Sequence, residues 1–126
     1  MTNEHWKDAP DEHDYPAARE YLSLLVHPKT AKALAKSLAD APLTYAKAKD
    51  LLRASQLDLL PADDADVRED LMKLHDGVKL SPVLLARGSL GGWPLIVADG
   101  YHRICASYHL DENADVACRI VDLPTR

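Results

Sequence analysis

A short stretch near the C-terminus combines residue types that can bind an anion. The apolar run 94–98 is followed at once by residues 99–103, which read Asp-Gly-Tyr-His-Arg. The run predicts a buried strand, and the apolar period after the glycine predicts a helix. The first N–H groups of a helix have no partner within it, and the helix dipole favours negative charge there. This pattern is therefore typical of a phosphate site.

Three residues of this turn are the first candidates for phosphate binding. Gly100 would let a ligand approach the backbone closely, or it serves only a tight turn. His102 and Arg103 point about 100° apart on a helix, so one can face a ligand while the other supports the turn. Arg can grip a phosphate with two parallel hydrogen bonds. The alternative is a surface pair, with Arg103 bridged to Asp99 or Glu112.

Four further residues could complete the site. Asp99 could cap the helix, hold Mg²⁺ beside a nucleotide, or act as a base, which makes it the candidate catalytic residue. Tyr101 could stack on a base or cover the apolar core. Lys79 and Ser81 precede the next strand and are candidate ligand-binding residues, with a solvated loop as the alternative.

Two residue groups have types that bind metals, but no metal site is expected from either. Asp63, Asp64 and Asp66 stand at a predicted helix start, where carboxylates commonly cap, and Asp66 with Glu69 resembles a capping box. No zinc is expected from the second group, because it lacks the usual paired spacing. That group consists of His102, Cys105, His109 and Cys118, whose two cysteines we interpret as small buried hydrophobes.

Helices dominate the expected structure of the first half of the chain. Asp14 is a possible N-cap of a helix that ends at His27, before a proline. Pro28 then begins the clearest helical period in the sequence, and Thr44 is expected to cap a third helix. Apolar residues recur through the second helix at Ala31, Leu34, Ala35 and Leu38.

The second half alternates between strands and helices. The expected order is a strand at 57–60, a helix from Asp66 to Gly77, a hairpin of strands 82–86 and 93–98 joined by loop 88–92, a helix at 101–110 and a strand at 116–121. Such an order predicts an α/β (α+β) fold with a small mixed sheet. At 126 residues the chain fits one domain, with residues 56–126 as its body and residues 1–55 as a helical extension packed on it. Trp6 is expected to anchor the N-terminal segment.

Composition limits the classes of partner. The net charge is −5, which argues against DNA because DNA-binding domains usually present a basic face. No segment has the length of a transmembrane helix or the pattern of a signal peptide, so a cytoplasmic protein without a membrane partner is expected. Lysines gather at Lys29, Lys32, Lys36, Lys47 and Lys49. We interpret them first as solvated helix faces and second as a partner surface.

Residues 57–123 resemble the ParB/sulfiredoxin superfamily, the ParB-like nuclease domain family. The resemblance lies in the glycine turn at 99–103, the strand beginning Ser-Pro-Val at 81–83, the closing strand at 116–121, and the order of elements around them. It implies a nucleotide or phosphate site at the Asp99–Arg103 turn, and phosphoryl transfer or nucleotide hydrolysis with Mg²⁺ as possible chemistry. Sulfiredoxins carry their catalytic cysteine where Tyr101 stands here, which argues against that reductase activity.

Two functions remain open from the sequence. The first is binding of a nucleotide or another phosphorylated small molecule at the Asp99–Arg103 turn, with or without catalysis. The alternative is a non-catalytic protein-interaction module on the same fold, in which the extension packs on the domain or on a second copy in a homodimer.

Overall fold

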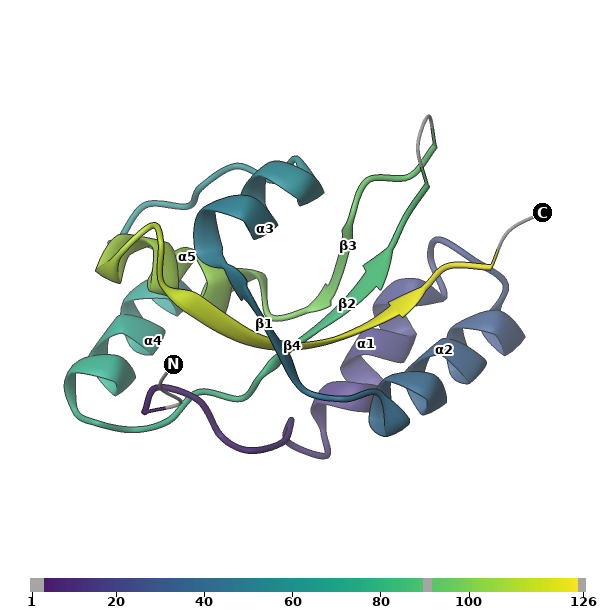
Figure 1. Ribbon diagram of the computed structural model, residues 1–126, viewed down its shortest axis with the longest axis horizontal. Coiled ribbons are helices and arrows are strands. Elements are labelled where there is room, and N and C mark those ends of the chain that lie inside the picture. The colour runs from purple at the N-terminus through teal and green to yellow at the C-terminus, as the bar shows by residue number, and fades with distance from the viewer. Residues whose placement is uncertain (1–3, 90–91, 125–126) are drawn as a thin grey trace.

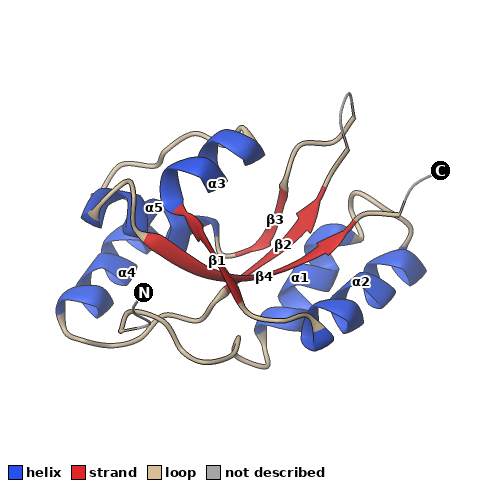
Figure 2. Cartoon of the chain, viewed as in Figure 1, coloured by secondary structure: helices blue, strands red, loops and turns tan. Residues whose placement is uncertain are grey.

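The computed structural model describes residues 4–89 and 92–124, and within them the chain forms three layers (Figure 1). A four-stranded sheet is the middle layer of the described residues, and helices cover both of its faces (Figure 2). One face carries α1 (Asp14–Leu22) and α2 (Pro28–Asp40), and the other carries α3 (Ala48–Ser55), α4 (Ala65–His75) and α5 (Tyr101–Leu110). The predicted small α/β fold is confirmed.

The sheet is mixed. Its spatial order is β1 (Thr44–Lys47), β4 (Asp115–Asp122), β2 (Val83–Arg87) and β3 (Ile96–Asp99). Strands β2 and β4 run parallel at the centre, and both edge strands pair antiparallel with their neighbours. The predicted hairpin is confirmed as β2 and β3. Part of its predicted loop, Leu90 and Gly91, lies outside the described residues.

Strand β2 is apolar from Val83 to Ala86 because both of its faces are buried there. Successive strand side chains point to opposite faces of a sheet. Val83 and Leu85 therefore join the core under α3, α4 and α5, while Leu84 and Ala86 join the core under α1 and α2. The uninterrupted apolar run in the sequence thus reflects a central strand between two helical layers.

Helix α2 forms where the sequence predicts it. Pro28 occupies its first turn, and the His27 side chain caps it by accepting a hydrogen bond from the Lys29 N–H at 3.1 Å. All four periodic apolar residues of the prediction are buried. Helix α1 also forms, but it ends at Leu22 and not at His27, and the predicted role of Asp14 is wrong. His13 is the N-cap residue, and Asp14 is buried with 3% of its surface exposed.

Two predicted local structures are wrong, each for a tertiary reason. Thr44 caps no helix, because residues 44–47 form the edge strand β1, in which Thr44 pairs with Cys118 of β4. Residues 57–60 form no strand. Side chains of α5 hold this loop instead, because the Tyr101 hydroxyl donates to the Asp58 carbonyl and His109 Nε2 lies 2.7 Å from the Leu60 carbonyl oxygen.

The start of α4 differs slightly from the predicted capping box. Asp64 is the N-cap, and its carboxylate accepts from the N–H groups of Asp66 and Val67, each at 3.1 Å. Asp66 lies inside the first turn. The predicted left-handed position after the helix is confirmed, since Gly77 has φ +75°.

The N-terminal segment is tied to the body as predicted for Trp6. Its indole is 2% exposed, and Nε1 donates to the Asp115 carbonyl at 3.0 Å. The backbone on either side of Trp6 hydrogen-bonds to the backbone N–H and C=O groups of Leu80. Residues 1–55 also supply β1 to the sheet, so the helical extension and the body share one sheet. None of the described helices has the combined length and apolar character needed to cross a bilayer.

Candidate functional site

The turn between β3 and α5 requires glycine. Gly100 has φ +115°, a conformation that residues with a Cβ rarely adopt. A Cβ there would lie 2.4 Å from Val83 Cγ1 and 2.9 Å from Arg103 Nη2. Two side chains of the protein therefore approach Gly100 closely, as in the tight-turn interpretation of this residue.

No side chain of the described residues caps the start of α5. Gly100 is the N-cap residue and has no side chain to offer, so the first N–H groups of α5 have no side-chain cap. Asp99 does not cap the helix, which corrects that interpretation of this residue. Its carboxylate turns instead to Arg103 of the same helix.

Arg103 bridges two carboxylates. Nη2 lies 2.8 Å from Asp99 Oδ2, and Nη1 lies 3.3 Å from Asp14 Oδ2. The side chain is only 15% exposed, and its Nε is buried without a hydrogen-bond partner among the described residues. Of the two predicted surface partners, Asp99 is the one found. The contact between Arg103 and Asp99 is partly buried, however, and Arg103 also contacts Asp14 of α1.

Asp14 is the functional-site neighbour that the sequence did not indicate. Besides Arg103, its carboxylate accepts a short hydrogen bond from the Ser81 hydroxyl, and Ser81 Oγ accepts from the Asp11 N–H at 2.9 Å. Ser81 is itself buried. Ser81 was predicted to bind a ligand, but its buried hydroxyl is already hydrogen-bonded to Asp14 and to the Asp11 N–H. An aspartate at a helix start is most simply interpreted as a cap, so nothing in the neighbouring sequence indicated that Asp14 would contact Arg103.

A cavity of about 230 Å³ lies against this turn, between α4 and α5. It brings together four of the residues predicted for the site with three acidic residues of α4. The lining consists of Asp66, Glu69, Asp70, Asp99, Gly100, His102 and Arg103. Four carboxylates thus face one guanidinium and one imidazole. The helix N-terminus favours an anion, but the walls around it favour a cation.

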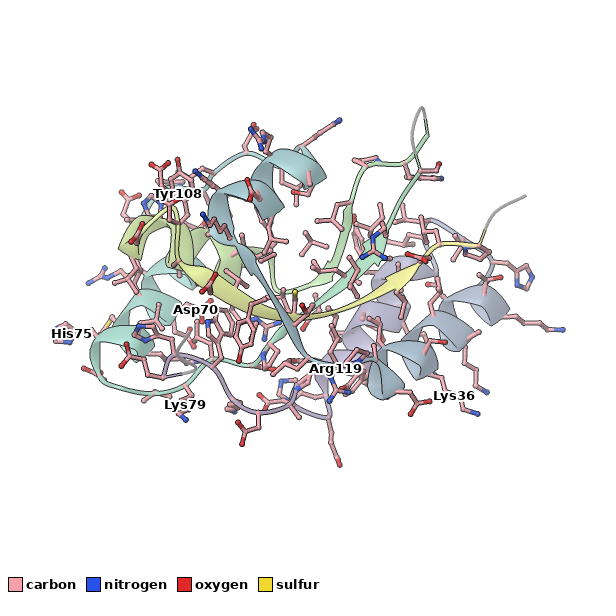
Figure 3. The ribbon with its side chains drawn as sticks, in the orientation of Figure 1. Lys36, Asp70, His75, Lys79, Tyr108 and Arg119 are labelled. Atoms are coloured by element: carbon pink, nitrogen blue, oxygen red, sulfur yellow. The ribbon has the colours of Figure 1, made fainter. Side chains whose placement is uncertain are left out.

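The other predicted site residues lie elsewhere. Tyr101 is partly buried against the core, and its hydroxyl donates to the Asp58 carbonyl. It therefore covers the apolar core, which was one of the two roles considered for it. Lys79 is exposed on the loop after α4, with its side chain directed away from the body of the domain (Figure 3). Neither residue lines the cavity.

Burial alters the acidity of two carboxyls in the cavity. Desolvation raises the pKa of Asp99, the nearby Asp14 carboxylate adds to this shift, and the Arg103 guanidinium opposes it. Desolvation also raises the pKa of Asp70, which is half-buried on α4. A positive charge placed in the cavity would stabilise both ionised forms.

His102 faces the acidic start of α4. Its Nε2 lies 3.6 Å from Asp66 Oδ2 and 4.0 Å from Asp64 Oδ2. One ligand atom from each of these residues lies within 4.8 Å of the other two, a grouping that could hold a divalent cation. The sequence did not suggest this set, since His102 comes from a different helix.

The two cysteines lie inside the core, as predicted. Both Cys105 and Cys118 are free and buried. Burial raises the pKa of the Cys105 thiol, and it raises the pKa of Cys118 to about 11. Both thiols are therefore protonated at neutral pH and poor nucleophiles.

No family model, curated protein or solved structure matches the chain.

Proposed function

We propose that this protein binds a nucleotide or another phosphorylated small molecule, together with Mg²⁺, in the cavity between α4 and α5. The observation that carries the proposal is the uncapped start of α5 beside an acidic wall. The resemblance of residues 57–123 to the ParB/sulfiredoxin superfamily supports the same site.

The acidic wall selects the form of the ligand. A bare phosphate at the α5 N-terminus would meet the carboxylates of Asp66, Glu69 and Asp70 across the cavity, and like charges repel at this range. Mg²⁺ prefers carboxylate oxygen ligands and commonly accompanies substrate phosphates. The carboxylates of α4 would attract the cation, and the group of Asp64, Asp66 and His102 has ligand atoms close enough together to hold it. The cation would neutralise phosphate charge, while the N–H groups of α5 donate to phosphate oxygens.

Arg103 has an indirect role in this proposal. Its guanidinium is already paired with both Asp99 and Asp14, so it fixes the turn that presents the α5 N–H groups. His102 is more accessible, with 41% of its side chain exposed, and is the basic residue best placed to meet a ligand. Catalysis by phosphoryl transfer or hydrolysis would require a base, and Asp99 is the cavity carboxylate nearest the turn.

The test is a thermal-shift panel of nucleoside mono-, di- and triphosphates, each with and without Mg²⁺. A ligand at a hundred times its dissociation constant stabilises the fold by about 2.7 kcal/mol. We expect a shift that needs both nucleotide and Mg²⁺, and that His102→Ala and Asp70→Asn reduce. His75→Ala is the matched control, because His75 is exposed at the far end of α4 (Figure 3).

One observation favours the second candidate, a non-catalytic interaction module. The most buried charges at the turn are paired with one another, as they would be in a purely structural network. The same panel separates the two candidates. Absence of a shift with every nucleotide, with and without Mg²⁺, would reject ligand binding and favour the module.

A further inference from the structure

A basic surface with an apolar floor lies on the helical layer opposite the candidate site. Two shallow hollows of about 300 Å³ each run along the outer faces of α1 and α2, and they share Arg19 and Lys32. We call this surface the α1–α2 groove. It is lined by Tyr15, Pro16, Arg19, Glu20, Ser23, Pro28, Lys32, Ala35, Lys36 and Ala39.

The cations of the groove lack acidic partners. Within residues 4–89 and 92–124, no ion pair involves Arg19, Lys32 or Lys36. Some exposed cations elsewhere are paired, as Arg53 is with Asp50 and Lys73 with Glu69. Although the net charge of the chain is −5, three cations without ion pairs among the described residues line this one groove.

Helix α2 keeps these cations together. Lys32 and Lys36 are spaced i, i+4 and so are neighbours on one helix face, where like charges are destabilising. Figure 3 shows Lys36 extending from α2 away from the body of the domain. The cost of this repulsion falls when an acidic group lies between the lysines.

The floor of the groove indicates which acidic partner fits. Ala35, Ala39 and the ring of Tyr15 form an apolar strip between the cations. Single-stranded nucleic acid is held by successive aromatic side chains, and the groove offers one. An apolar strip with a cationic rim instead complements an amphipathic segment whose carboxylates flank its apolar side chains.

We propose that the α1–α2 groove binds an acidic amphipathic segment of a partner protein. Carboxylates of the segment lie between Arg19, Lys32 and Lys36, and its apolar side chains rest on Ala35 and Ala39. The groove and the candidate site share no residue, so this binding is independent of the proposed function.

The experiment measures fluorescence anisotropy of a labelled synthetic peptide in which Glu and Leu recur at helical spacing, at physiological salt. We expect saturable binding to the whole chain. Lys32→Glu/Lys36→Glu weakens it at least tenfold. Lys47→Glu/Lys49→Glu changes the net charge equally, at a different surface on β1 and α3, and leaves the affinity within about twofold. Thermal melts of both variants verify their folding.

Four results would overturn the proposal. The first is no saturable binding of the peptide. The second is an equal loss in both charge-reversal variants, which would mean attraction by net charge alone. The third is equal or stronger binding of polyglutamate or single-stranded DNA, which would remove the role of the apolar floor. The fourth is self-association of the chain that Lys32→Glu/Lys36→Glu abolishes, which would make a second copy the occupant.

Discussion

Nη1 of Arg103 lies 3.3 Å from Oδ2 of Asp14, and this contact joins the start of α5 to the start of α1. The two side chains are 15% and 5% exposed, so the pair is largely shielded from water. Breaking a buried pair leaves a charge without compensation, which costs more than the pair contributes when intact. Arg103 is therefore a structural residue of the turn, whatever ligand the cavity takes.

Arg103→Met is expected to lower the free energy of unfolding by about 3 kcal/mol, because the Asp14 carboxylate stays buried without its cation. Urea denaturation measures the change. Arg53→Met is the matched control, because its pair with Asp50 is exposed and such pairs contribute about 0–1 kcal/mol. Asp14→Asn/Arg103→Met should recover part of the loss. Equal effects of the two single variants would show that the Arg103 network adds no more stability than an exposed ion pair.

Gly100→Ala is expected to destabilise the protein by about 3 kcal/mol, since it adds both a strained φ and a clash with Val83. Gly77→Ala separates the two effects. Gly77 also has a positive φ, +75°, but no described residue beyond its chain neighbours lies within 4 Å of the added Cβ, so about 1 kcal/mol of strain is expected alone. Melting temperatures of both variants test this order. A smaller effect at Gly100 than at Gly77 would contradict the packing described for the turn.

Trp6→Ala is expected to cost about 3–5 kcal/mol, the usual range for removing a large buried aromatic side chain. Trp6→Phe keeps most of the apolar contact but loses the hydrogen bond to the Asp115 carbonyl, so its cost is smaller. Trp93→Ala is the control, because Trp93 is 48% exposed. Chemical denaturation followed by circular dichroism compares the three variants. Equal costs at Trp6 and Trp93 would mean that the N-terminal segment is not anchored.

Local patterns predicted the elements whose stability is local. The period of Ala31, Leu34 and Leu38 and the proline before it located α2, because burial and capping both act within one helix. The strand, glycine and helix at residues 94–110 were also predicted from local patterns, although β3 is shorter than expected. The five residues 99–103 were enough to predict a glycine turn before the helix.

Long-range contacts explain the rest. Thr44 is in a strand because it pairs with β4, whereas the residues next to it in the sequence favoured a helix cap. Asp14 and Arg103 stand 89 positions apart, so neither residue indicates the other in the sequence. The acidic wall of the cavity was missed likewise, since Asp70 meets the α5 turn only when α4 packs on α5. The site predicted from the turn alone therefore included Asp99 but lacked the carboxylates of α4.

Asp70→Asn should stabilise the protein at neutral pH and have little effect in acid. Burial raises the pKa of the Asp70 carboxyl in the folded state, so the folded protein binds this proton more tightly than the unfolded chain does. Stability from this group is lost as the pH rises from the ordinary carboxyl pKa to the raised value, and the penalty stays constant above it. Removing the carboxylate removes that penalty. Urea denaturation of Asp70→Asn and of the exposed control Glu69→Gln, from pH 3 to 8, tests this, and a benefit of Asp70→Asn that is greatest in acid would reverse the assigned sign.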